Sequence, residues 1–246
     1  MRLVLLIPVY NEMLHLPGFL TRLPDEAEIL LVDDGSRDGS REFLATWART
    51  RSGVEVLHLP VNQGKSQALA AGLERITARL EEGLLQAEDG LVLLDGDGQH
   101  PPEVCPELNA ERVRRRLDML VACRDFSLYP FWKILGNRLL TLQARLLTRF
   151  PWKDTQCGMR ALSVGRASEA AAILGRERFC CEQEWCVALP LRGWKVANDF
   201  PIHTQHYRSN STLLDAFLIF MAALRVWARH RLEQACRIFD SSPSSS

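Results

Sequence analysis

Residues 91–100 read LVLLDGDGQH, in which four apolar residues run directly into acidic residues and glycines. A short, continuous apolar run that stops at turn residues is typical of a strand buried on both faces of a parallel sheet. Alternate residues of an extended segment point the same way, so Asp95, Asp97 and Gln99 can present oxygen atoms to one cation. Such hard ligands suit Mg²⁺ or Mn²⁺, which keep positions open for substrate phosphates. The segment therefore predicts a metal site where a buried strand ends.

The competing interpretation of this segment is an Asp-Gly turn with solvated acids. A calcium-binding loop fits less well, because its sixth position would be His100 instead of glycine and its twelfth is not glutamate. We therefore retain the metal site as the prediction.

Outward from this segment, other apolar runs also have the character of buried strands: Leu3–Ile7, Ile29–Val32, Val54–Leu59 and Leu117–Ala122. Between them lie apolar residues spaced as on one face of a helix, in two sets: Leu69, Leu73, Ile76 and Leu80, then Leu135, Leu139, Leu142 and Leu146. This alternation of strands and helices predicts an α/β fold with a mostly parallel central sheet flanked by helices.

Two further polar motifs follow the first two strands, PVYNE at residues 8–12 and VDDGS at residues 32–36. Ligands of open α/β sheets bind at the carboxyl ends of the strands, so all three motifs are expected at one site. A dinucleotide-binding fold would need a glycine-rich turn after the first strand, whereas no glycine occurs here before Gly18. The sequence therefore argues against a dehydrogenase.

Bulk composition narrows the class of protein. The 246 residues are 47% hydrophobic, enough for a substantial core, and 30 basic residues balance 30 acidic ones, so a nucleic-acid partner is not expected. Seven cysteines without a CxxC pair, and an N-terminus without a basic leader, favour a reducing, cytoplasmic compartment. The longest apolar run, Ala216–Leu224, is far shorter than the ~20 residues of a spanning helix.

The last part of the chain changes character. Residues Leu213–Ile238 predict one long helix that is apolar first and then basic, followed by a serine-rich tail. The helix either packs on the domain or lies in a membrane interface. In the second case residues 213–238 would make a peripheral contact with the membrane. We expect a catalytic domain over residues 1–211, this helix over 212–239 and a disordered tail over 240–246.

Taken in order, the motifs make the chain resemble the family 2 glycosyltransferases, which have the GT-A nucleotide-diphospho-sugar transferase fold. Within them it is most similar to the dolichol-phosphate mannosyltransferase and polyprenyl-phosphate glycosyltransferase branch. The resemblance runs from Leu3 to about Thr212 and includes, besides the motifs above, NQGKSQALAAGL (62–73), DGDGQHPPE (95–103), ACR (122–124), GNRLL (136–140), DTQCGMRAL (154–162), EQEW (182–185) and HYRSNST (206–212).

The resemblance implies an inverting transfer of one sugar from a nucleotide diphosphate, UDP- or GDP-linked, to an isoprenoid lipid phosphate at the inner face of the membrane. It assigns the nucleoside to six residues: Pro8, Tyr10, Glu12, Asp34, Asn62 and Lys65. Asp95, Asp97 and Gln99 would bind the metal and diphosphate. Arg124 and Arg138 would hold the acceptor phosphate, because a guanidinium fork pairs well with phosphate oxygens.

The acceptor is left open between two chemistries. A lipid phosphate is already ionised and needs no general base, whereas a hydroxyl on a glycan or another lipid must lose a proton, for which Asp154 and Glu184 are the candidate bases. With a phosphate acceptor these two residues would instead organise the site. Phe131, Trp132 and Trp152 either meet the isoprenoid chain or, as we expect, pack in the core.

Two departures from the family pattern bear on function. Many bacterial relatives carry two C-terminal transmembrane helices, which we do not expect in this chain, and the tail motif reads Ser209-Asn210-Ser211 where the family often has glycine before the serine. The QxxRW motif of processive synthases is absent, which favours transfer of a single sugar. A third class of function is a non-catalytic sugar-nucleotide binder or a nucleotidyltransferase. The intact Asp95 and Asp97 argue against the binder, and the lack of a glycine-rich basic loop after the first strand argues against the nucleotidyltransferase.

Overall fold

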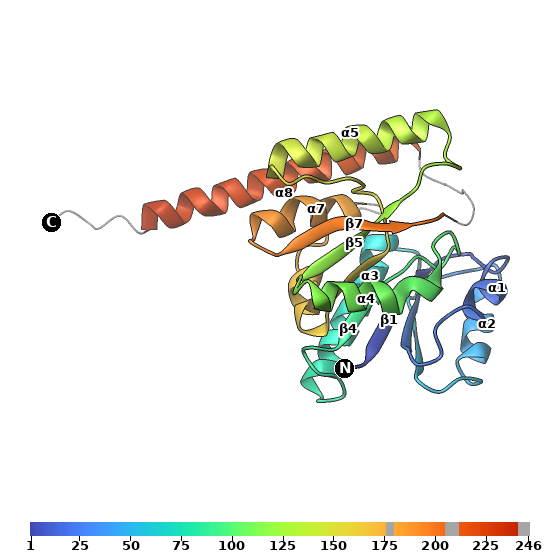
Figure 1. The fold of residues 1–246 in the computed structure, drawn as a ribbon. Coiled ribbons are helices and arrows are strands. Elements are labelled where there is room, and N and C mark those ends of the chain that lie inside the picture. The colour runs from blue at the N-terminus through green and yellow to red at the C-terminus, as the bar shows by residue number, and fades with distance from the viewer. Residues whose placement is uncertain (176–179, 205–211, 241–246) are drawn as a thin grey trace.

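A computed structural model describes residues 1–175, 180–204 and 212–240, the last four of these for their backbone only. Its centre is a seven-stranded sheet in the order β3-β2-β1-β4-β6-β5-β7 (Figure 1). The strands are β1 (Leu3–Val9), β2 (Glu28–Asp33), β3 (Val54–His58), β4 (Gly90–Leu93), β5 (Met119–Arg124), β6 (Arg160–Ser163) and β7 (Val196–Ile202). The five predicted strands are confirmed, and β6 and β7 are additional.

The sheet is mostly parallel, as predicted. Strands β1 to β4 run parallel to one another, and β7 runs parallel to β5. Strand β6 alone among the described strands is antiparallel to both of its neighbours, β4 and β5. This arrangement leaves the carboxyl ends of β2, β1 and β4 side by side at one edge.

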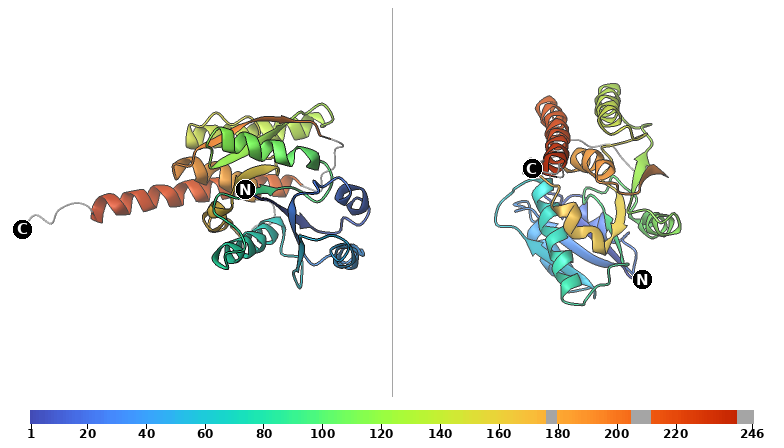
Figure 2. Two further views of the ribbon diagram at one scale, coloured as in Figure 1. Left: turned by 60° about the horizontal axis from the view of Figure 1, so that its bottom comes forward. Right: turned by 90° about the vertical axis from the view of Figure 1, so that its left-hand side faces the viewer.

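The helices cover both faces of the sheet (Figures 1 and 2). They are α1 (Leu16–Leu20), α2 (Ser40–Trp47), α3 (Lys65–Glu81), α4 (Cys105–Arg114), α5 (Phe131–Thr148), α6 (Ala167–Ala171), α7 (Cys181–Leu191) and α8 (Leu213–Asp240), with short 3-10 turns at Pro102–Val104 and Val164–Arg166. The α/β fold class expected from the sequence, a mostly parallel central sheet flanked by helices, is therefore confirmed.

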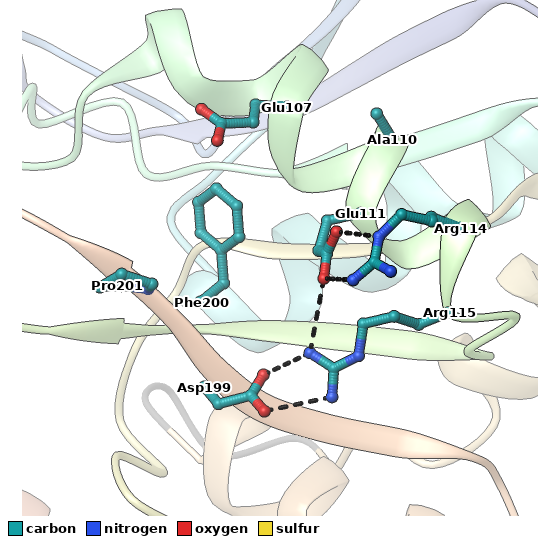
Figure 3. A pocket seen from close by; sticks show the side chains of 8 residues that line it. All are labelled: Glu107, Ala110, Glu111, Arg114, Arg115, Asp199, Phe200 and Pro201. Carbon is teal, nitrogen blue, oxygen red and sulfur yellow. Dashed lines mark hydrogen bonds and ion pairs between the residues drawn. The ribbon is translucent and has the colours of Figure 1, made fainter.

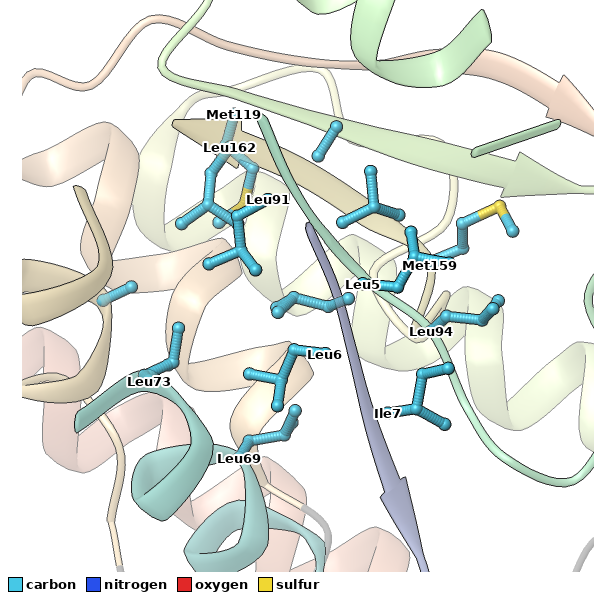
Figure 4. Packing of buried hydrophobic residues seen from close by; sticks show 14 of the residues in the cluster. Leu5, Leu6, Ile7, Leu69, Leu73, Leu91, Leu94, Met119, Met159 and Leu162 are labelled. Atoms are coloured by element: carbon cyan, nitrogen blue, oxygen red, sulfur yellow. The ribbon is translucent and has the colours of Figure 1, made fainter. Parts of the chain in front are cut away.

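Part of the core lies where α3 packs on β1. Figure 4 shows Leu69 and Leu73 of α3 beside Leu6 of β1, all three buried. A Cβ added at Gly72 would lie 2.3 Å from Leu6 Cδ1, so only glycine lets the helix approach the sheet this closely. Each such leucine stabilises the fold by about 1.5–3 kcal/mol relative to an exposed one. The helical stripe predicted over this segment is confirmed.

Helices α5, α7 and α8 form a layer of their own. In Figures 1 and 2, α5 and α8 run along one side of the molecule with α7 against the sheet, and the C-terminal part of α8 extends beyond the body. A small apolar cluster holds this layer together: Leu140, Cys180, Ile219 and Ala222. Gln143 of α5 also donates to the carbonyl oxygen of Phe220 in α8 at 2.8 Å. The predicted long helix therefore packs on the domain through its first half.

The outer face of α5 departs from expectation. The predicted helix is present, but its leucine stripe faces outward: Leu135, Leu139, Leu142 and Leu146 are all exposed. Phe131 and Trp132, expected in the core, are 74% and 70% exposed, so that prediction was wrong, whereas Trp152 is fully buried as expected. Periodicity reveals which residues share a helix face but does not reveal whether anything covers it.

No helix in the described part of the chain is both long and apolar enough to cross a membrane. Residues 241–246, which make up most of the predicted disordered tail, lie outside the described residues, as does the HYRSNST motif apart from Thr212.

Candidate active site

The three strand-end motifs meet because β2, β1 and β4 are neighbours. Glycines allow the loops to pack against one another. A Cβ added at Gly96 would lie 2.9 Å from the Pro8 carbonyl oxygen, and one added at Gly35 would lie 2.6 Å from the backbone of Val61. Gly35 also has a φ of +70°, which favours glycine. The fold thus brings PVYNE, VDDGS and DGDGQH together as the sequence predicted.

Asp34 organises the loop before α3. Its buried carboxylate accepts hydrogen bonds from the side chain of Asn62 at 3.0 Å and from the backbone N–H groups of Gln63 and Gly64 at 2.7 and 2.8 Å. These bonds hold the loop against the end of β2. The nucleoside contacts assigned to Pro8, Tyr10, Glu12, Asp34, Asn62 and Lys65 stay a prediction.

Asp95 is paired with a lysine. The Lys65 Nζ, at the start of α3, lies 2.5 Å from Asp95 Oδ1 and 2.5 Å from Glu182 Oε1 on α7. Burial alone would lower the pKa of Lys65, but the two carboxylates outweigh it and hold that pKa well above its ordinary value. Burial likewise opposes ionisation of Glu182, and Lys65 nevertheless lowers its pKa. Lys65 and Glu182 are therefore both charged at neutral pH.

Asp97 and Gln99 are joined to each other. The Gln99 backbone N–H donates to Asp97 Oδ1 at 3.0 Å, and the Gln99 side-chain amide donates to Asp97 Oδ2. Within the described ranges, no three His, Cys, Asp or Glu side chains converge into a complete metal cluster. The loop thus offers two aspartates, one held by Gln99 and the other held by Lys65.

The wall behind Asp95 is formed by Gly158 and His100. A Cβ added at Gly158 would lie 2.4 Å from Asp95 Oδ2, so a side chain there would displace the carboxylate. The His100 Nδ1 lies 3.9 Å from the same oxygen, is buried and has no hydrogen-bond partner among the residues that the structure describes. Burial lowers the pKa of His100, which keeps the imidazole neutral near pH 7. The wall therefore adds a polar but uncharged group.

Arg124 and Asp154 form a buried, bidentate pair. The Arg124 Nε and Nη2 donate to the two carboxylate oxygens at 2.7 and 2.9 Å, and the Arg124 backbone N–H donates at 3.2 Å. Asp154 is fully buried; burial would raise its pKa, but the Arg124 charge and hydrogen bonds outweigh this and lower it. The guanidinium also lies over the rings of Phe126 and Tyr129, 5.6 and 5.4 Å from their centroids.

Sequence reasoning missed the residues that position this pair. Asn198 on β7 accepts from the backbone N–H groups of Lys153 and Asp154 at 2.8 and 2.7 Å and donates to the carbonyl of Ala122 on β5 at 3.0 Å. Asn137 on α5 donates to Asp154 Oδ1 at 3.2 Å. Asn198 lies in β7, which was not predicted, so no signal in the sequence pointed to it.

A cavity of about 400 Å³ opens between these groups and the layer of α5 and α8. Its lining combines polar and apolar residues: Asp95, Gln99, His100, Arg124, Phe126, Tyr129, Trp132, Lys133, Gly136, Asn137, Leu140, Gln156, Thr212, Leu213, Ala216 and Ile219. Arg138 is exposed on α5 and is not among the described residues that line it. Lys133, five residues earlier on the same helix, does line it.

Glu184 also lies away from this cavity. Its buried carboxylate accepts from the Gly175 backbone N–H at 2.9 Å, whereas Glu182 contacts Lys65. Residues two apart on a helix point about 200° from each other, so only one of the pair can face the site. Sequence reasoning selected Glu184 from EQEW, and the residue beside Asp95 is Glu182.

A second hollow, of about 570 Å³, lies between α4 and β7 (Figure 3). Its charged groups are largely paired with one another: Arg115 with Asp199 at 2.6 Å, and Arg114 with Glu111 at 2.6 Å. None of the three strand-end motifs contributes to its described lining, so it is separate from the site above.

Comparison with known proteins agrees with this geometry. The family model described as glycosyl transferase family 2 matches residues 4–167. Among solved structures, glucosyl-3-phosphoglycerate synthase from Mycobacterium tuberculosis in complex with Mn²⁺, UDP and glucosyl-3-phosphoglycerate has a TM-score of 0.64. The similarity covers 93% of this chain and 79% of that chain, at 14% sequence identity, and so concerns the fold.

Two curated relatives are similar in sequence. Undecaprenyl-phosphate 4-deoxy-4-formamido-L-arabinose transferase of Pseudomonas paraeruginosa is 33% identical over 211 residues, covering 82% of this chain and 55% of the relative. Undecaprenyl-phosphate mannosyltransferase of Micrococcus luteus is 39% identical over 127 residues, covering 50% of this chain and 49% of the relative. The chain thus spans about half the length of the curated relatives it matches. With the family model matched over most of its length and the motifs converging at one edge of the sheet, the chain belongs to glycosyl transferase family 2.

Proposed function

We propose that this protein transfers a single sugar from a nucleotide-diphosphate sugar to a polyprenyl phosphate, with Mg²⁺ or Mn²⁺ bound at Asp95 and Asp97. The observation that carries the proposal is the mixed lining of the cavity between the strand-end motifs and the α5–α8 layer. The strand ends contribute charged groups, Asp95 and Arg124, and the two helices contribute apolar side chains, among them Trp132, Leu213 and Ile219. A phosphate attached to an isoprenoid chain has the same two-part character.

The residues around Asp95 and Asp97 fit a divalent cation. Mg²⁺ is ordinarily held by one or two carboxylates together with substrate phosphates, so a complete protein cluster is not required. Gly158 leaves the space that the Asp95 carboxylate fills, and the Gln99 amide lies against Asp97. The bound cation would offset the negative charge that develops on the departing diphosphate, an effect of several kcal/mol. The Mn²⁺ and UDP in the named mycobacterial structure support this assignment.

The state of the two candidate bases favours a phosphate acceptor over a hydroxyl. Asp154 is fully buried, is paired with Arg124 and has a lowered pKa, which makes it a poor proton acceptor. The Glu184 carboxylate accepts a hydrogen bond from the Gly175 backbone N–H and lies away from the cavity. A phosphate acceptor needs neither, because it is already ionised. The two relatives named as undecaprenyl-phosphate transferases support the same acceptor class.

Arg124 and Lys133 are the cations we assign to the acceptor phosphate, since both line the cavity. Asp154 fixes the orientation of the Arg124 fork, and a fork held in place binds a phosphate with less loss of side-chain freedom. Arg138 is not among the described residues that line the cavity and is assigned no direct contact. Its exposed position suits a membrane surface with anionic head groups better.

The same proposal gives a role to the exposed apolar faces of α5 and α8. Large apolar side chains are exposed along both helices: Phe131, Trp132, Leu135, Leu139, Leu142, Leu146, Leu213, Leu214, Phe217, Leu218, Phe220 and Met221. Many exposed apolar side chains on two neighbouring helices indicate an interaction surface. We assign these helix faces to contact with the membrane that holds the acceptor, next to the cavity that α5 and α8 help to line.

One panel of reactions tests the proposal. Purified protein is incubated with Mn²⁺ or Mg²⁺ and labelled UDP- or GDP-sugars, with and without polyprenyl phosphate. We expect a labelled, acid-labile lipid product that requires the metal, and a loss of at least ~100-fold in Asp97→Asn, which removes one carboxylate from the ion. A product stable to mild acid would favour a hydroxyl acceptor instead. Near-normal turnover by Asp97→Asn would contradict the proposal that Asp97 binds the metal.

A further inference from the structure

Lys65 forms an ion pair with Asp95, one of the two carboxylates proposed to bind the metal. Its ammonium contacts Asp95 Oδ1 and Glu182 Oε1, each at 2.5 Å, and so links the start of α3, the end of β4 and the first turn of α7. Asp97, the other proposed ligand, is held by Gln99 and not by a cation in any described contact. In this arrangement a positive charge of the protein lies directly against one proposed metal ligand.

We propose that Lys65 is a stand-in cation, which neutralises Asp95 while no metal is bound and stays with Glu182 when a divalent cation takes Asp95. The inference rests on the metal site of the proposed function. Two cations competing for one carboxylate oxygen repel each other, so metal binding requires that the ammonium leave Asp95. Glu182 makes this exchange feasible, because it keeps a partner for an ammonium that is mostly buried.

Glu182 is fixed independently of Lys65. The Cys181 Sγ lies 2.9 Å from Glu182 Oε2, and the buried Arg160 guanidinium donates to the Glu182 carbonyl oxygen at 3.2 Å. The carboxylate therefore has a defined position whether or not Lys65 also contacts Asp95. Lys65 and Glu182 act as positioning residues in this scheme, since they set how readily Asp95 accepts the metal.

The test measures Mn²⁺ binding to the whole chain by electron paramagnetic resonance of the free ion, without donor or acceptor. Lys65→Met should bind Mn²⁺ at least about fivefold more tightly, which corresponds to an ion pair contributing about 1 kcal/mol. Lys195→Met removes one positive charge from an exposed surface position and should leave the affinity unchanged. Unchanged or weaker binding by Lys65→Met would overturn the inference.

A charge-neutral double variant separates displacement from a simple field effect. Lys65→Met combined with Glu182→Gln removes one positive and one negative charge, so the net charge of the site is kept. If Lys65 competes for Asp95, this variant still binds Mn²⁺ more tightly than the unaltered protein. Wild-type affinity would mean that only the local field mattered and would also overturn the inference.

Should these variants fail to fold, a crystal structure of the unaltered protein with MnCl₂ decides the question. Lys65 should then contact Glu182 and no longer contact Asp95; Lys65 still on Asp95 beside a bound ion, or no bound ion at millimolar MnCl₂, would contradict the inference. Because sugar transfer is not measured, this outcome is independent of the reaction panel. If Mn²⁺ binding changes as predicted but no sugar transfer is detected, the proposed function is refuted and the inference about Lys65 stands.

Discussion

Replacing Gly158 by alanine tests the site with a single added methyl group. Gly158 lies behind Asp95, and the new Cβ would be 2.4 Å from Asp95 Oδ2. Real Cβ atoms essentially never come within 3.0 Å of a heavy atom, and ordinary contact begins near 3.4 Å. The carboxylate must therefore move by about 1 Å, away from the position that Lys65 and the proposed metal share.

The expected effect on activity exceeds the effect on stability. Turning Asp95 off its rotamer costs about 0.5–1.5 kcal/mol, and the backbone of Gly158 needs no positive φ, so the fold should survive. A displacement of about 1 Å at a reacting centre can cost about 100-fold in rate. We therefore expect Gly158→Ala to lose about 100-fold in metal-dependent transfer while the free energy of unfolding falls by less than about 2 kcal/mol.

The assay pairs the reaction panel with urea unfolding and Mn²⁺ titration of the same preparations. Gly18→Ala is the matched control, because a Cβ added there meets nothing within 4 Å. The control should retain full transfer and Mn²⁺ affinity. Full transfer by Gly158→Ala would refute the reasoning, since the carboxylate of Asp95 would then not need its observed position. A collapse in stability matching the loss in transfer would refute it as well.

Three further outcomes are expected. Asp154→Asn should lower the free energy of unfolding at pH 7 by about 3–5 kcal/mol, because it leaves a buried guanidinium unpaired. Despite burial, that guanidinium lowers the pKa of Asp154, so the stabilisation is present above the ordinary carboxyl pKa and is lost as the pH falls through the lowered value. Urea unfolding should therefore show the difference in unfolding free energy between the two proteins narrowing as the pH falls below the ordinary carboxyl pKa. Leu139→Glu, on the exposed α5 face, should weaken sedimentation with anionic vesicles at least about fivefold without changing the melting temperature. Leu84→Glu, at an exposed position outside α5 and α8, should change neither sedimentation nor the melting temperature. Equal losses of sedimentation in the two variants would contradict the assigned face. Glu182→Gln should reduce transfer at least about tenfold and Glu184→Gln less than about threefold, and the reverse order would show that the wrong glutamate has been placed at the site.

The strands and the site edge were accessible from sequence because their signals are local. Continuous apolar runs indicate strands that are covered on both faces, and each polar motif directly follows such a run. Parallel strands place their carboxyl ends at the same edge, so Asp34 and Asp95 could be predicted to meet although 61 positions separate them. Strands β6 and β7 carry weaker signals, since β6 has only four residues and β7 contains Asn, Asp and Pro.

The partners of individual side chains were not accessible in this way. Sequence indicated that Arg124 and Asp154 both matter, but only the fold shows them bound to each other, with Asn198 fixing the loop between them. The choice of Glu182 over Glu184 depends on the rotation of α7 against the sheet. These contacts join segments far apart in the chain, and no local pattern encodes which groups will meet.

By itself, the sequence determined the α/β class, the edge at which the polar motifs converge and the residue types available there, because these depend on periodicity and on strand-end position. The tertiary structure alone decided that Lys65 lies on Asp95, that Lys133 and not Arg138 lines the cavity, and that the leucine stripe of α5 faces outward. The physical reason is that a pattern specifies which side chains share a face, whereas the packing of distant elements determines what that face meets.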